Sequence, residues 1–155
     1  MNIENPLIIA VNNTRIIPLF FIRIFKVGGF KKIMVTVYCL GNKYIKKDSL
    51  ALKFVDREIN GMKFVEYDQN VEGDIWIMDV CMHLHEMKLL DLEAFLVKQP
   101  LSMHDFDIGT ELKLLQAVGQ IGKVNVIAIP MEFTYDQVLS NLNSKKWVEQ
   151  DIQGS

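Results

Sequence analysis

Three short segments of the chain consist almost entirely of apolar residues, many of them β-branched. They are Ile33–Leu40, Ile75–Val80 and Val124–Ile129. Apolar runs of this length are typical of strands buried on both faces, such as the central parallel strands of α/β proteins. Two further segments, Met62–Tyr67 and Leu92–Val97, predict shorter strands, the second closed by a proline that cannot donate to a sheet.

Between these strands, apolar residues recur with the period of a helix. This spacing predicts a helix over 49–59, ended by Asn60-Gly61, and another over 107–118. Thr134 with Gln137 three residues later forms a capping-box pattern before a last helix. The alternation of strands and helices predicts an α/β protein, a three-layer α/β/α sandwich with a mostly parallel central sheet of about five strands.

The length and composition narrow the classes of protein. A chain of 155 residues can form one domain with its own core. We expect that domain at residues 32–147, after an N-terminal extension (1–31) and before a polar tail (148–155). The net charge is −2 and the pI is about 5.9, whereas a nucleic-acid-binding protein usually carries a basic face. Nucleic acid is therefore not an expected partner.

The first thirty residues and the two cysteines indicate where in the cell the protein is expected to be. Residues 6–27 are apolar-rich, but charged residues and a proline interrupt them, so they fall short of the roughly 20 apolar residues of a membrane span. They also lack the pattern of a signal peptide, although a basic amphipathic membrane contact stays open. Cys39 and Cys81 are expected to be packed thiols rather than a disulfide, which favours the cytoplasm.

Polar residues follow the predicted strands where ligands bind in open α/β sheets, at the carboxyl ends. Gly41-Asn42 and Asp48 follow the first strand, Asp79 lies near the end of the second long one, and His104 precedes a predicted helix. Asp48 alone would suit a helix N-cap. A buried carboxylate such as Asp79 is costly to desolvate without a cation or amide donors. A helix start lowers the pKa of a nearby histidine and favours the neutral imidazole that metals bind.

In this order, the motifs resemble those of the hydrogenase maturation proteases, which trim the carboxyl-terminal tail of a nickel-iron hydrogenase large subunit. The resemblance covers roughly residues 32–146 and implies a shortened, divergent member, because Lys47 stands where the family has the first of two acids. It implies that Asp48, Asp79 and His104 are the metal-contacting residues, with Asp79 as the catalytic residue.

The resemblance further implies a cytoplasmic, monomeric endopeptidase whose partner is the large-subunit precursor after nickel insertion. The implied cofactor is nickel, carried by the substrate or bound at the site; zinc or another divalent ion suits the same ligands. No Gly-x-Ser-x-Gly, His-Glu-x-x-His or Gly-x-Gly-x-x-Gly motif supports another enzyme class. The alternative is a noncatalytic metal- or protein-binding module on the same scaffold.

A second metal constellation is conceivable after Asp79. If the strand continued, Asp79, Cys81, His83 and His85 would share one face, because side chains alternate along a strand. We expect instead that the strand stops near Cys81 and that both histidines lie in the following loop.

Overall fold

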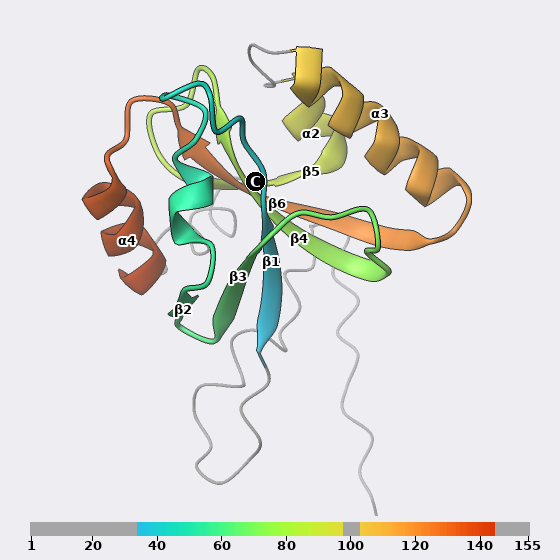
Figure 1. Ribbon diagram of the computed structural model, residues 1–155, viewed down its shortest axis with the longest axis horizontal. Helices are drawn as coiled ribbons and strands as arrows, with labels where there is room; N and C mark the ends of the chain where they lie inside the picture. Colours follow the sequence, from blue (N-terminus) through green and yellow to red (C-terminus); the bar gives the residue numbers. More distant parts are fainter. Residues whose placement is uncertain (1–33, 98–102, 145–155) are drawn as a thin grey trace, which may run out of the picture. The chain divides into compact units, whose positions relative to one another are not determined.

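The computed structural model describes residues 34–97 and 103–144 of the chain (Figure 1). The predicted N-terminal extension and polar tail lie outside these ranges. Within them, one mixed sheet has the strand order β2-β3-β1-β4-β6-β5. The strands are β1 (Val35–Cys39), β2 (Glu58–Ile59), β3 (Met62–Glu66), β4 (Gly73–Cys81), β5 (Lys88–Asp91) and β6 (Ile121–Pro130). The helical elements are the 3-10 turn η1 (Ala51–Phe54) and the α-helices α2 (Leu92–Val97), α3 (Met103–Ala117) and α4 (Tyr135–Ser144).

The α/β prediction is confirmed, and the three long apolar runs form the centre of the sheet. Strands β3, β1, β4 and β6 run parallel to one another. The two edge strands, β2 and β5, are antiparallel to their neighbours, so the sheet is mixed and has six strands rather than about five.

The helix predicted over 49–59 is wrong, since only η1 is helical there. Asn60 and Gly61 have φ values of 51° and 81° and join β2 to β3 as a hairpin. Two successive positive φ angles belong to the type I′ turn, for which Asn-Gly is the preferred sequence. Asn60-Gly61 is therefore a hairpin turn and not the predicted helix end.

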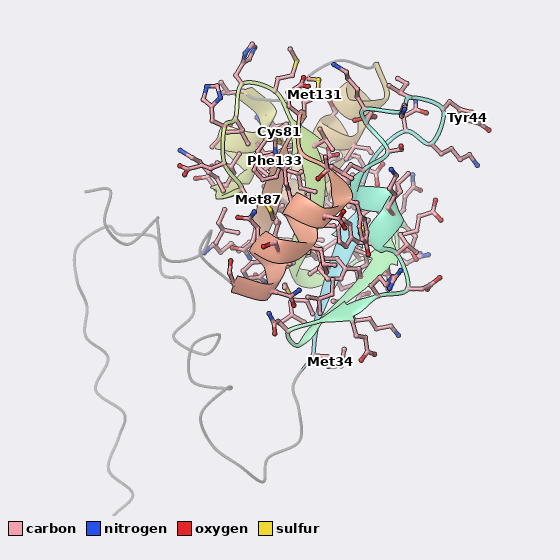
Figure 2. All side chains as sticks on the ribbon, turned by 90° about the vertical axis from the view of Figure 1, so that its left-hand side faces the viewer. Met34, Tyr44, Cys81, Met87, Met131 and Phe133 are labelled. Atoms are coloured by element: carbon pink, nitrogen blue, oxygen red, sulfur yellow. The ribbon has the colours of Figure 1, made fainter. Side chains whose placement is uncertain are left out.

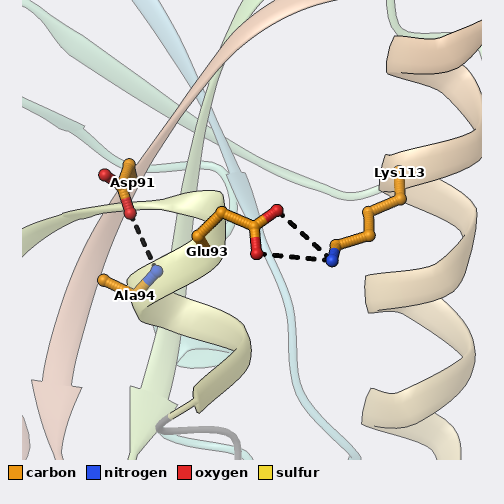
Figure 3. Close-up of polar contacts among 4 residues, drawn as sticks. All are labelled: Asp91, Glu93, Ala94 and Lys113. Carbon is orange, nitrogen blue, oxygen red and sulfur yellow. Dashed lines mark hydrogen bonds and ion pairs between the residues drawn. The ribbon is translucent and has the colours of Figure 1, made fainter.

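The strand predicted at Leu92–Val97 is also wrong, because these residues form α2. The carboxylate of Asp91 accepts a hydrogen bond of 2.8 Å from the amide of Ala94, as Figure 3 shows. A carboxylate in that position caps the first turn of a helix. Glu93 of α2 forms an ion pair of 3.2 Å with Lys113 of α3, and both side chains are exposed, so the pair contributes less than about 1 kcal/mol.

Helices α2 and α3 share a core with one face of the sheet, which includes Ile75, Ile77 and Cys81 of β4. Phe95 of α2 and Leu112 of α3 are fully buried in it. Because side chains alternate along a strand, Asp79 lies on this same face of β4. Figure 1 shows α4 and η1 well separated from α2 and α3.

The core beneath α4 and η1 is aromatic. The ring of Phe54 in η1 stacks on Tyr135 of α4 with centroids 4.5 Å apart, and it lies 6.0 Å from the ring of Phe64 in β3. Val138 and Leu142 of α4 are fully buried. In the described part of the chain, no helix has the length and hydropathy required to cross a membrane.

Candidate functional site

The strand order contains a point where the chain changes direction across the sheet. From β1 the chain continues through η1 and β2 to β3 on one side, whereas from β4 it continues through β5 to β6 on the other side. In open α/β sheets, ligands bind beyond the carboxyl ends of the strands at such a switch point. Asp48 follows β1, and Asp79 lies two residues before the end of β4. The two predicted acids thus lie after β1 and near the end of β4, the strands that flank the switch point.

The loop after β1 is folded around the carboxylate of Asp48. The backbone amide of Asn42 donates a 2.9 Å hydrogen bond to Oδ2 of Asp48, and the Asp48 side chain is only 8% exposed. The amide of Ile45 donates to the carbonyl of Asn42, and the amide of Asp48 donates to the carbonyl of Ile45. Asp48 is not the cap residue of η1, because that position belongs to Leu50. Its carboxylate closes the loop instead.

Gly41 has a steric reason to be glycine. Its φ of 142° is one that side chains disfavour, and a Cβ built on it would lie 2.3 Å from the carbonyl oxygen of Asp48. Because the obstacle is backbone, no side-chain rotation relieves it. The two residues of the Gly-Asn pair therefore have different roles. Gly41 lets the backbone of Asp48 come close, and the amide of Asn42 donates a hydrogen bond to the Asp48 carboxylate.

Asp79 is almost completely buried, with 1% of its surface exposed. Its Oδ1 accepts a 2.8 Å hydrogen bond from the backbone amide of Val80. It stands between Ile77 and Cys81 on the face of β4 that packs toward α2 and α3.

The negative charge of Asp79 affects Cys39, the last residue of the neighbouring strand β1. Burial, and then the charge of Asp79, raise the pKa of the Cys39 thiol to about 12. A thiol with this pKa stays protonated near neutral pH and is not a nucleophile. Cys39 and Cys81 are both buried and are not joined in a disulfide, as the sequence predicts. Cys39 therefore lacks the thiolate that a cysteine protease needs.

His104 lies within the first turn of α3, since this helix begins at Met103 rather than near residue 107 as predicted. The side chains of residues 103–107 lie outside the described part, so the convergence of His104 with Asp48 and Asp79 stays a prediction. In Figure 1, the beginning of α3 and the loop after β1 lie toward the same end of the sheet. The backbone placement thus agrees with a common site.

The rival constellation does not form. Strand β4 ends at Cys81, and Met82–His83 makes a turn in which His83 has a φ of 57°. His83 and His85 are exposed while Cys81 is fully buried. Among the residues that the structure describes, no three His, Cys, Asp or Glu side chains are grouped to hold a metal ion. The prediction that both histidines lie in the loop is confirmed.

Two features at this edge were not identified from the sequence. Tyr67, directly after β3, donates a 2.8 Å hydrogen bond from its hydroxyl to Glu111 of α3 and packs edge-on against Tyr38 of β1. Tyr44 and Ile45 project from the loop after β1 and are exposed. The sequence contains a signal for this exposed loop. Two large side chains, Tyr44 and Ile45, stand between the turn residues Gly41-Asn42 and the lysines Lys46-Lys47.

Comparison with protein-family models, curated proteins and solved structures finds no match to the chain. The sequence pattern and the geometry of the sheet edge therefore carry the functional argument.

Proposed function

We propose that the chain is a metal-dependent endopeptidase that removes the carboxyl-terminal extension of a nickel-iron hydrogenase large-subunit precursor after nickel insertion. The single observation that carries the proposal is the placement of two buried acids at the switch point, Asp48 in the loop after β1 and Asp79 near the end of the adjacent parallel strand β4. The resemblance to hydrogenase maturation proteases supplies the substrate. A three-layer α/β/α arrangement with a largely parallel sheet, a cytoplasmic location and a monomeric state belong to the same proposal.

The donor set fits a divalent ion. Two carboxylates and one imidazole suit nickel or zinc, and Asp48, Asp79 and His104 would hold it. When bound, such an ion polarises a carbonyl or activates water in hydrolases. The nickel within the precursor is part of the substrate that the enzyme recognises.

The residues of the chain have distinct tasks in this proposal. Because burial strengthens electrostatic interactions at short range, the carboxylate of Asp79 serves as a ligand or as the base that takes a proton from the water that attacks the scissile carbonyl. The amide of Asn42 holds Asp48 in position, and Gly41 allows the backbone of Asp48 to come close. The protonated Cys39 thiol forms part of the packing and takes no proton.

The test is incubation of the full chain with a purified large-subunit precursor, nickel-loaded in one sample and nickel-free in the other. Intact-mass spectrometry should show loss of one carboxyl-terminal peptide from the loaded precursor only. Binding of the loaded precursor without any loss of mass would instead favour the noncatalytic binding module. Equal cleavage of both samples would contradict the dependence on nickel.

A further inference from the structure

We propose that the Tyr44 loop, defined as residues 43–47, is a docking surface for a polypeptide segment that combines carboxylates with large apolar side chains. The proposal rests on the proposed function, because the segment is assigned to the substrate of the same site. It adds a recognition surface beside the predicted metal ligands, formed by residues that are not among those ligands.

The loop exposes two large side chains next to each other, Tyr44 and Ile45. The side chain of Tyr44 is 87% exposed and that of Ile45 is 41% exposed. Figure 2 shows Tyr44 projecting away from the body of the fold, on the opposite side of the view from Met87. Neighbouring exposed apolar residues on a protein surface often mark a contact site. A tyrosine suits such a contact because it offers a large area at low cost in conformational entropy.

The loop is held in shape by its own hydrogen bonds. The amide of Tyr44 donates a 2.9 Å bond to Oδ1 of Asn42, and the amide of Ile45 donates to the carbonyl of Asn42. The backbone amide of this same Asn42 is bonded to the carboxylate of Asp48. One asparagine thus connects the exposed pair with a buried acid of the candidate site. A segment bound to Tyr44 therefore lies beside that site.

The positive charges of the Tyr44 loop indicate which kind of polypeptide segment it binds. Lys43, Lys46 and Lys47 are exposed, and no acid occurs among residues 43–47. The ammonium of Lys43 lies 5.4 Å from the centre of the Tyr44 ring, and that of Lys47 lies 3.4 Å from Glu132. Among the residues that the structure describes, Lys43 and Lys46 form no ion pair with a carboxylate, and both flank the exposed Tyr44 and Ile45. This charge complementarity favours an acidic and apolar segment over a basic or purely polar one.

The test uses the full chain and three fluorescent twelve-residue peptides measured by fluorescence anisotropy. One peptide alternates Glu with Leu and Phe, a second has Lys in place of Glu, and a third has Ser in place of Leu and Phe. The first should bind at least about tenfold more tightly than either of the others, which corresponds to about 1.4 kcal/mol. Equal binding of all three peptides would overturn the proposal.

Variants locate the binding on the loop. Tyr44→Ser and the double variant Lys43→Gln with Lys46→Gln should each weaken binding of the first peptide about tenfold, as expected for the loss of an aromatic anchor or its charged rim. Leu114→Ser on α3 and Lys63→Gln on β3 remove an exposed apolar residue and an exposed lysine elsewhere, and should leave binding unchanged. Because Tyr44 is so exposed, its replacement should not unfold the chain. Loop variants that bind like the wild type would contradict the proposal.

The same variants separate docking from cleavage. With the nickel-loaded precursor as substrate, Tyr44→Ser should raise KM and leave kcat unchanged, because docking contributes equally to the ground and transition states. If the wild type does not cleave the precursor, the peptide assay still decides the docking proposal by itself. Binding to vesicles of anionic lipid, without selective binding of the first peptide, would identify a membrane contact and overturn it.

Discussion

Two loops at the same edge of the sheet carry residues that could bind a metal, and they differ in where those residues lie. The loop after β1 is closed by the carboxylate of Asp48, which is buried and bonded to the amide of Asn42. The loop after β4 has His83 and His85, both exposed, and turns at a positive φ of His83. A sequence motif becomes a site only where backbone contacts hold the side chain in place. This difference favours Asp48 over the two histidines.

The most damaging change to the first loop should be Gly41→Ala. The added Cβ would meet the carbonyl oxygen of Asp48 and impose an unfavourable φ, so we expect a loss of about 3 kcal/mol in the free energy of unfolding. Urea denaturation of the wild type and the variant measures it. The matched control is Gly119→Ala, where φ is 75° but nothing lies within 4 Å of the added Cβ. This control should cost about 1 kcal/mol, and equal losses would show that the close approach at Gly41 is not decisive.

Metal titration sharpens the contrast between the loops. His104→Ala should weaken binding of nickel or zinc by at least about tenfold, since it removes a predicted ligand. The double variant His83→Ala with His85→Ala should leave the affinity unchanged, because both side chains point to solvent. Isothermal calorimetry on the full chain measures all three affinities. The reverse pattern, with loss only in the double variant, would move the site to the loop after β4.

A smaller effect is expected from the contact that joins the end of β3 to α3. Burial, and then the hydrogen bond to Glu111, raise the pKa of the Tyr67 hydroxyl above its usual value of about 10. The folded state therefore keeps this proton when the unfolded chain has lost it. The resulting stability is fully present below about pH 10 and is lost as the pH rises toward the folded-state pKa.

Tyr67→Phe should remove both the hydrogen bond and its pH dependence. We expect a loss of about 1 kcal/mol near neutral pH and a shallower fall in melting temperature as the pH rises above about 10. Tyr44→Phe serves as a control at an exposed tyrosine, and its melting curves should follow those of the wild type. An unchanged alkaline slope in Tyr67→Phe would show that other groups, such as the Cys39 thiol, dominate it.

The sequence was most informative where burial alone decides the structure. The apolar runs of β4 and β6 predict their strands directly because these strands are buried on both faces. The run of β1 also predicts its strand, although Thr36 is exposed and Tyr38 half-buried. In two other segments, polar residues determine a local structure that differs from the one predicted by the spacing of apolar residues. Asn60-Gly61 forms a hairpin turn, although the apolar spacing predicts a helix end there. Asp91 caps helix α2, although the sequence predicts a strand over these residues.

The candidate site was predictable only in part. The order of the motifs predicts that Asp48 follows one buried strand and that Asp79 lies near the end of another. The switch point between β1 and β4 did not, because it depends on which strands pair across long distances in the chain. The bond from Asn42 to Asp48 and the overlap that demands Gly41 are contacts of folded backbone, which residue types alone do not specify.

The most direct test of the proposed protease site is the Asp79→Asn variant, with cleavage and melting measured on the same sample. The substitution keeps the size of the side chain and removes its charge, so cleavage of the nickel-loaded precursor should fall at least about a hundredfold while the melting temperature changes little. Asp74→Asn, an exposed acid at the opposite end of β4, is the matched control and should cleave like the wild type. Full cleavage by Asp79→Asn would contradict the assignment of Asp79 to the catalytic site.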